Sequence, residues 1–347
     1  MMLGLVVILA VIFIMPFVFT KVEKNLEIFL FIMGVLAATI SGILNFEFIK
    51  EILLNDMLYF VSGAVLVAGL IFKFTAKKIS VGVNLIIQKV PTFIFVFVLI
   101  VLIGLISSAI TAIVASLILV EIVMVLPYPR RTKVNLMIIT CFSIGLGAAL
   151  SPIGEPLSTI VVSTLDADFF FLLNLLGAYI IPGIIALGIF GALYVTRSIK
   201  KYNENVNTNS EISRDVYEES IKEVLVRTGK IFIFILGLEL LGTGFNPLID
   251  AYVLDFSNKV LYWINICAAA LDNATVAAAI ISPSMTTIQV KSILMGLLIS
   301  GGMLIPGNIS NIVVAESFDI KSREWAKLGM PLGLVLLVIY YVALFVI

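Results

Sequence analysis

The sequence predicts an all-α polytopic membrane protein with two repeats of inverted topology, each containing a re-entrant hairpin and a broken transmembrane helix. Of its 347 residues, 61% are hydrophobic and 13% are charged. Apolar runs of about 20 residues, the length that an α-helix needs to cross a bilayer, recur along the whole chain. Polar, helix-breaking motifs interrupt these runs in each half, and such motifs are costly in hydrocarbon unless they line a site.

Eight apolar segments read as spans: Met2–Thr20, Leu26–Leu44, Met57–Phe74, Lys133–Leu165, Phe169–Thr196, Lys230–Phe245, Lys291–Ser317 and Trp325–Ile347. Two further segments, Pro91–Pro127 and Asn258–Thr287, are interrupted near the middle by a polar motif. Their arms have roughly 13 to 18 residues, about 20–27 Å as helix, which is short for a bilayer core of about 30 Å. We therefore expect each segment to be a re-entrant hairpin that enters and leaves on one side.

The basic residues give the orientation. If the segments cross in this order, all but Lys50, Lys259 and Lys291 of the 22 Lys and Arg lie on one side. The side richer in basic residues is cytoplasmic, so we expect both termini outside the cell membrane. A re-entrant hairpin and a tight pair of full spans give the same count, so both alternatives stay open.

This topology divides the chain into four parts. They are two peripheral N-terminal helices (1–56), a first repeat (57–196) with hairpin 91–127 and broken helix 133–165, a cytoplasmic linker (197–229), and a second repeat (230–347) with hairpin 258–287 and broken helix 291–317. The first hairpin opens from the cytoplasm and the second from outside. Inverted repeats with broken helices are typical of secondary transporters.

The breaks and hairpin tips carry candidate binding groups. Residues suited to breaking a helix are Pro152, Gly154, Pro156, Pro306 and Gly307. The hydroxyl and amide groups beside the breaks and at the tips are Ser108, Thr111, Ser151, Ser158, Thr159, Asn273, Thr275, Asn308, Ser310 and Asn311. Their oxygens could bind a hard cation, and the half-helix ends add N–H groups and carbonyls. The alternative is that they only cap the half-helices, because capping uses the same atoms.

Two acids are more decisive than the neutral groups. Asp272 lies at the second hairpin tip and Glu155 at the first helix break, where a carboxylate costs about 2.5–3.5 kcal/mol to insert. No Lys or Arg lies in a motif to pair with them. A carboxylate that binds a proton and a cation such as Na⁺ in turn is the minimum that a cation/proton antiporter needs. The alternative is a permanently protonated acid that donates a hydrogen bond between helices.

The two repeats differ in where they carry an acid. Ser108 occupies the position of Asp272 in the first repeat, and no acid in the second break corresponds to Glu155. If both tips and both breaks meet, the two carboxylates share one neighbourhood. Glu239, inside the span Lys230–Phe245, could pair with a site residue or relay protons.

The motifs resemble those of the ion transporter superfamily, which includes NhaD-type sodium/proton antiporters, arsenite permeases and divalent-anion/sodium symporters. Asp272-Asn273-Ala274-Thr275 resembles the Asp-Asn-x-Pro/Thr hairpin motif of the antiporter and arsenite branches. Ser151-Pro152-Ile153-Gly154 is similar to the end of their Gly-Gly-Asn-x-(Thr/Ser)-Pro-Ile-Gly signature. The resemblance covers residues 57–347 and is strongest to an uncharacterised prokaryotic branch of cation transporters. It implies a scaffold with a mobile domain, elevator motion and, in many members, a homodimer.

The sequence therefore predicts a secondary active transporter in contact with membrane lipid, most simply a sodium (or lithium)/proton antiporter that uses alternating access and no cofactor. The alternative is a sodium-coupled symporter of a small anion such as a dicarboxylate, or an oxyanion permease. An intramembrane enzyme is disfavoured, because a zinc protease needs His, which is absent, and Gly242-Thr243-Gly244 is followed by Phe245 where a di-aspartate protease needs Asp. A net charge of zero argues against nucleic acid as a partner.

Overall fold

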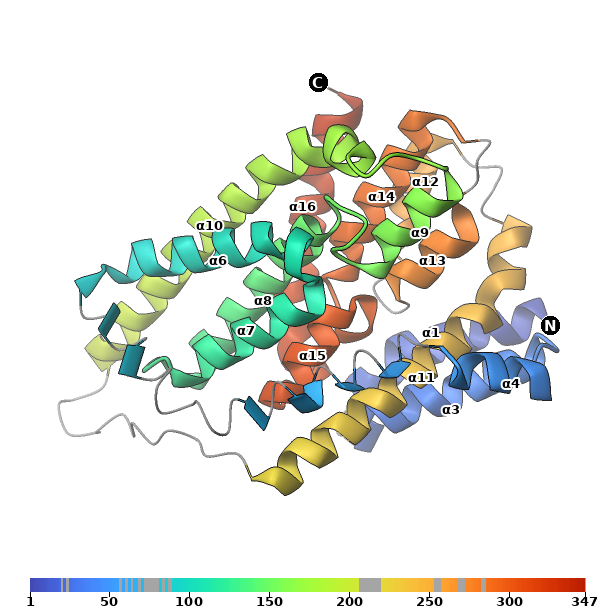
Figure 1. Cartoon of the computed structure of the whole chain (residues 1–347), viewed down its shortest axis with the longest axis horizontal. Helices are drawn as coiled ribbons and strands as arrows, with labels where there is room; N and C mark the ends of the chain where they lie inside the picture. The colour runs from blue at the N-terminus through green and yellow to red at the C-terminus, as the bar shows by residue number, and fades with distance from the viewer. Residues whose placement is uncertain are drawn as a thin grey trace.

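The computed structural model describes residues 1–19, 21–22, 25–55, 58–59, 62–63, 65–67, 70–71, 81–82, 85–86, 89–205, 220–252, 257–266, 272–281 and 285–346, and the regular structure in these residues is entirely helical (Figure 1). The helices are α1 (Met2–Val18), α3 (Leu26–Ile40), α4 (Phe46–Leu53), α6 (Thr92–Ile110), α7 (Ala112–Val125), α8 (Arg130–Ala148), α9 (Pro156–Thr164), α10 (Phe171–Asn205), α11 (Ile221–Tyr252), α12 (Asn258–Ile264), α13 (Asn273–Ile280), α14 (Thr287–Gly301), the 3₁₀ turn η2 (Ile305–Gly307), α15 (Ile309–Phe318) and α16 (Ser322–Phe345).

The helices form two groups. In Figure 1, α1, α3, α4 and α11 lie together along one side of the molecule, and the remaining helices form the larger group. Helix α11 packs closely along α3, because a Cβ atom at Gly34 would lie only 2.7 Å from the carbonyl oxygen of Gly237. In the larger group, α8 and α14 are almost completely buried and contact each other. They are the centre around which the other helices pack.

The outer helices have the surface of a membrane protein. By length and composition, α6, α10 and α16 are the described helices that could cross a membrane. On α6, Ile94, Val98 and Leu102 recur at every fourth position and are exposed, which places them along one face of the helix. A continuous exposed apolar face of this kind is unfavourable in water and favourable against lipid. The chain is thus an all-helical protein with the character of a membrane protein.

Both predicted helix breaks are present. Helix α8 ends at Ala148 and α9 begins at Pro156, whereas α14 ends at Gly301 and α15 begins at Ile309. Pro156 suits the start of a helix, where its missing N–H leaves no hydrogen bond unmade. In the second break, the Asn311 amide donates hydrogen bonds to the carbonyls of Gly301 (2.7 Å) and Leu304 (2.9 Å). The side chain therefore satisfies backbone groups that the interrupted helix leaves open.

The first hairpin turns at Thr111, between α6 and α7. Helix α6 has 19 residues, more than the expected length of an arm, and at 1.5 Å per residue it is about 28 Å long. Its length therefore does not require the hairpin to be re-entrant, and the re-entrant topology stays a prediction. In the second hairpin, α12 and α13 flank the tip, of which 267–271 lie outside the described residues.

Two segments differ from the sequence prediction. The linker 197–229 is shorter than expected, because α10 continues to Asn205 and α11 already begins at Ile221. Outside the apolar layer, charged residues with good helix propensity can extend a helix that the apolar layer has started. Helix α4 was not predicted; the Asn45 side chain caps it by accepting a hydrogen bond from the Phe48 N–H (2.8 Å). Half of the residues of the predicted span Met57–Phe74 lie outside the described residues.

Candidate functional site

The two hairpin tips and the two helix breaks meet around one cavity of about 240 Å³. Its walls consist of Thr111, Ala112, Ile113, Pro152, Ile153, Gly154, Glu155, Pro156, Thr159, Asp272, Asn273, Ala274, Asn308 and Ile309. The structure thus brings together four motifs that are up to about 200 residues apart in the chain. Both carboxylates that the sequence singled out, Glu155 and Asp272, are in the cavity wall.

Four helices begin at this cavity. Thr111 directly precedes α7, Glu155 precedes α9, Asp272 precedes α13 and Asn308 precedes α15. A helix N-terminus carries a partial charge of roughly +0.5, so the four ends together supply about +2. This charge is comparable in size to the charge of two ionised carboxylates. The helix ends therefore lower the cost of keeping Glu155 and Asp272 ionised away from bulk water.

Reciprocal packing places these four helix starts. Helix α7 of the first hairpin packs on α15, and α13 of the second hairpin packs on α9. The first tip is also bound to the first break, because Ala112 N–H donates to the Gly154 carbonyl at 2.7 Å and the Ser151 hydroxyl donates to the Ser108 carbonyl. Thr111 has φ +75°, a conformation that a residue with a side chain rarely adopts and that often marks a functional site.

Glu155 is the most unusual side chain of the cavity. It is 5% exposed, and its Oε1 atom has no hydrogen-bond partner among the described residues. Its Oε2 atom accepts one long hydrogen bond, 3.5 Å, from the amide of Asn308. The carboxyl groups of Glu155 and Asp272 interact electrostatically. Because a buried acceptor without a partner is costly, the arrangement points to a ligand that completes the coordination of Glu155.

The neutral groups of the cavity are few. Thr111, Thr159, Asn273 and Asn308 contribute hydroxyl or amide groups, and the Asn273 Nδ2 atom is buried without a hydrogen-bond partner among the described residues. No Lys or Arg belongs to the described part of the wall. In the described part of the chain, no three His, Cys, Asp or Glu gather in a way that could hold a metal ion. The donor set is thus one of hard oxygen atoms, which suits a proton or an alkali cation better than a transition metal.

Several predicted ligands do not line the cavity: Ser108, Ser151, Ser158, Ser310 and Asn311. The hydroxyl of Ser108 donates to the Leu105 carbonyl (2.7 Å), and that of Ser310 donates to Asn308 Oδ1 (3.1 Å). The side chains of Ser108, Ser151 and Asn311 thus bond backbone carbonyls at the tips and breaks, whereas Ser310 bonds the side chain of Asn308. Ser158 is fully buried and its hydroxyl has no partner among the described residues. The side chain of Thr275 lies outside the described part of the structure.

The helix-break residues divide in the same way. Pro152, Gly154 and Pro156 line the cavity, whereas Pro306 and Gly307 are buried in η2 and do not. The apolar members of the wall were not predicted: Ala112, Ile113, Ile153, Ala274 and Ile309. Each lies within two positions of a predicted polar residue. In an apolar segment, this closeness in sequence is what could have indicated that they line the cavity.

The position of the first tip corrects one comparison between the repeats. Helix α6 continues through Ser108 to Ile110, so the helix after the first tip starts at Thr111. Measured from these helix starts, Thr111 rather than Ser108 has the place that Asp272 has in the second half. By the same measure, Asn308 has the place of Glu155. Each half therefore supplies one acid and one neutral side chain.

Glu239 lies beside the cavity and not in its wall. It is part of α11, and one of its carboxylate oxygens accepts a hydrogen bond from the Asn55 amide at 2.8 Å. Its carboxyl group interacts electrostatically with Asp272. Helix α11 also packs on α13, the helix that directly follows Asp272.

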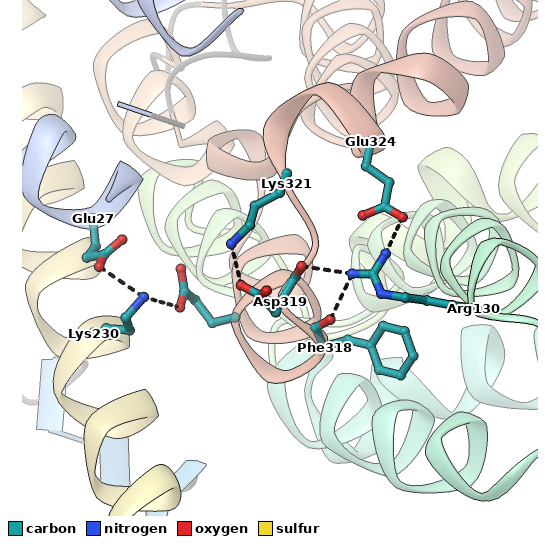
Figure 2. Close-up of polar contacts among 8 residues, drawn as sticks. Glu27, Arg130, Lys230, Phe318, Asp319, Lys321 and Glu324 are labelled. Carbon is teal, nitrogen blue, oxygen red and sulfur yellow. Dashed lines mark hydrogen bonds and ion pairs between the residues drawn. The ribbon is translucent and has the colours of Figure 1, made fainter. Parts of the chain in front are cut away.

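A group of charged side chains lies at the C-terminal end of α15, and its acidic and basic members form ion pairs (Figure 2). Lys230 Nζ lies 3.1 Å from a carboxylate oxygen of Glu27 and 3.7 Å from one of Glu316. Nearby, Lys321 pairs with Asp319, and Arg130 pairs with Glu324. Arg130 also donates to the carbonyls of Asp319 (2.9 Å) and Phe318 (3.4 Å). We call these residues the paired-charge cluster.

The described residues form an all-helical fold with the character of a membrane protein, in which the starts of four helices surround a cavity with two carboxylates. The chain belongs to the family described as "Protein of unknown function (DUF1646)", whose model matches residues 2–347. Comparison with curated proteins gives no match. The function therefore has to be inferred from the chemistry of the cavity.

Proposed function

We propose that the protein is a secondary active transporter that exchanges Na⁺ or Li⁺ for protons, with Glu155 and Asp272 as the groups that bind both ions. The observation that carries the proposal is the cavity itself: Glu155 is buried there with one oxygen unbonded among the described residues, beside a second acid. Two carboxylates that interact, one buried (Glu155) and one partly buried (Asp272), are stabilised together by a proton or a cation. Because a proton or a cation can each stabilise the two carboxylates, the two ions compete for the same site.

The charge balance of the cavity favours exchange over simple binding. Four helix N-termini offset much of the charge of two carboxylates, so the site tolerates one added positive charge more easily than two. When a proton forms an O–H bond with one carboxylate, that oxygen loses its charge and the bound cation leaves. When the O–H bond breaks again, a cation can return. The hydroxyl oxygens of Thr111 and Thr159 line the cavity and can replace part of the hydration shell of the cation, whereas Asn308 Oδ1 already accepts hydrogen bonds from the N–H and hydroxyl of Ser310.

Alternating access is part of the proposal, and the packing supports it. The contact of α7 with α15 mirrors that of α13 with α9, as expected if the halves 57–196 and 230–347 are inverted repeats. The smaller group consists of α1, α3, α4 and α11. It contacts the larger group through α11, which packs on α13 and α15, and through α1, which packs on α16. One of the two helix groups can therefore act as a scaffold and the other as a moving unit. The homodimer that the family resemblance implies fits the same arrangement.

The test is ion exchange in proteoliposomes that contain the purified protein and a pH-sensitive dye. We expect a sodium gradient to drive proton movement with the natural protein, and Glu155→Gln or Asp272→Asn to abolish it. Glu121→Gln in α7 is the matched control, because it removes an acid from the same region without changing the cavity wall. Exchange at full rate in both cavity variants would contradict the proposal.

A second function, sodium-coupled symport of a small anion, is favoured by one observation. Four helix N-termini at one cavity form the positive surroundings that carboxylate or oxyanion groups prefer. In that case sodium ions would neutralise Glu155 and Asp272, and the anion would bind the helix ends. Uptake of a labelled dicarboxylate that requires a sodium gradient, without proton counterflow, would support this function over antiport.

A further inference from the structure

Glu239 occupies an unusual position in α11, the helix between the two groups. Helix α11 packs on α3 and α4 on one side and on α13 and α15 on the other. The residue lies in an apolar stretch, where a carboxylate costs about 2.5–3.5 kcal/mol to insert. Lys230, on the same helix, is nine residues away, or about 14 Å along the axis, and is paired with Glu27 and Glu316. Ion pairing with the nearest Lys of its helix thus does not explain Glu239.

The surroundings of Glu239 hold its carboxylate in one place. The amide of Asn55, which lies two residues after the end of α4, donates to Glu239 Oε1 at 2.8 Å. The side chain of Glu239 is half-buried, in contrast to Glu155, which is 5% exposed. The Glu239 carboxylate is thus held by a hydrogen bond and is partly accessible, and both properties suit a group that receives and passes on a proton.

Glu239 has acidic neighbours on two sides. It interacts electrostatically with Asp272 in the cavity wall and with Glu51 in α4. Glu51 is exposed, so the three acids extend from the cavity wall to the surface of the protein. At the inner end, the unbonded oxygen of Glu155 independently indicates that the cavity binds a ligand.

We propose that Glu239 relays protons between Asp272 and water on the α4 side of the protein, with Glu51 at the outer end. This inference rests on the proposed antiport function. In the release direction, the O–H bond of Asp272 breaks and an O–H bond forms on Glu239, directly or through one water molecule. Glu239 then gives the proton to water, and Asp272 remains as the carboxylate that binds the cation. Glu239 serves the proton only, because it lies outside the cavity wall and a cation needs several oxygen ligands at once.

The test separates proton-coupled from proton-free transport. In proteoliposomes, exchange of ²²Na⁺ for Na⁺ needs the cavity but no proton, whereas exchange of Na⁺ for H⁺ needs both. We expect Glu239→Gln to slow Na⁺/H⁺ exchange at least tenfold and to leave ²²Na⁺/Na⁺ exchange within twofold of the natural rate. Glu239→Asp should restore part of the proton-coupled rate, since it keeps a titratable group. Asn55→Ala should slow that rate a few-fold by loosening the carboxylate. Glu47→Gln, which removes an exposed acid of α4, is the control without effect.

The outcomes are distinct. If Glu239→Gln slows both exchanges equally, the residue is a structural element or a cation ligand and the relay is wrong. If it slows neither, no proton passes through it. If Glu239→Gln does not fold, Asn55→Ala tests the relay in its place. The relay predicts slower Na⁺/H⁺ exchange and unchanged ²²Na⁺/Na⁺ exchange for this variant. If the natural protein itself shows ²²Na⁺/Na⁺ exchange but no Na⁺/H⁺ exchange, the antiport function has failed, and this is seen before any variant is measured.

Discussion

The two ends of α15 place carboxylates in opposite electrical surroundings. At its start, Asn308 is next to Glu155 in a cavity whose described wall contains no Lys or Arg. Near its end, Glu316 belongs to the paired-charge cluster, where Lys230 lies between Glu316 and Glu27 (Figure 2). Glu27 is 3% exposed, as deeply buried as Glu155. Glu27 and Glu155 are thus similarly buried but differ in counter-charge, which fits the proposal that the first holds the fold and the second exchanges ions.

The paired-charge cluster also has a structural task. Lys230 belongs to α11, Glu27 to α3 and Glu316 to α15, so one side chain joins the smaller helix group to the larger group. A fixed cation keeps these carboxylates charged without any ion from solution. The described wall of the cavity contains no Lys or Arg, so in the proposed function an ion that enters the cavity supplies the counter-charge. The predictions below test this difference, in order of the size of the expected effect.

The largest effect is expected for Glu155→Gln. Removing the charge should reduce Na⁺/H⁺ exchange by a factor of a hundred or more, because the cation loses a charged ligand. Stability should stay the same or rise, since a buried charge without a fixed partner is removed. Exchange rates and thermal unfolding of the purified protein measure the two effects. A clear loss of stability would show that Glu155 serves the fold, as Glu27 does.

Gly154→Ala should be the next most damaging change. A Cβ atom at this position would lie 1.9 Å from the carbonyl oxygen of Ala148, which is backbone and cannot rotate away. The first break must shift, and the hydrogen bond from Ala112 N–H to the Gly154 carbonyl shifts with it. We expect a loss of about 3 kcal/mol in the free energy of unfolding, as for other steric conflicts in a packed core, and loss of exchange. Gly63→Ala is the matched control, because a Cβ atom there meets nothing within 4 Å.

Glu27→Gln should lower the stability and leave the cavity unchanged, whereas Glu155→Gln should impair exchange and leave the stability unchanged or higher. Glu27→Gln removes a buried partner of Lys230 and should cost about 2 kcal/mol of unfolding free energy. The value is below the figure of about 3–5 kcal/mol for fully buried pairs, because Lys230 is 37% exposed and Glu316 still pairs with it. The sodium affinity of the cavity should not change. Chemical denaturation and ²²Na⁺ binding check the two parts, and a weaker affinity with unchanged stability would contradict the division between the two sites.

The sequence predicted the chemistry of the site better than its geometry. Composition and apolar length gave the helical membrane class, and Pro152, Pro156 and Pro306 marked both breaks, because their effects on a helix are local. Which hydroxyl and amide groups reach the cavity depends on packing between distant helices. Asn311 and Asn308 therefore look equivalent in the sequence, although one completes the backbone of the second break and the other faces Glu155. Pairing of Lys230 with Glu27 and Glu316 was invisible for the same reason.

Asn308→Ala should have a moderate effect. It removes both the cap of α15, where the side chain accepts a hydrogen bond from the Ser310 N–H at 3.1 Å, and the long hydrogen bond to Glu155. Loss of an N-cap costs about 1 kcal/mol of unfolding free energy. Sodium affinity should fall a few-fold, because Glu155 loses its neutral neighbour. Asn308→Ser keeps a capping oxygen but no amide, so it should restore stability and not affinity; equal recovery of both would assign Asn308 to the helix alone.

The smallest effect is expected for Arg130→Gln at the edge of the paired-charge cluster. Its pair with Glu324 joins side chains that are 50% and 30% exposed, and water screens such pairs. The loss should be about 0.5 kcal/mol of unfolding free energy and should shrink further at high salt. Lys230→Gln, measured beside it, should cost several times more and respond less to salt, because both of its acids are more buried. Equal losses for the two variants would mean that depth of burial does not set the strength of these pairs, and that the contrast between cluster and cavity needs another cause.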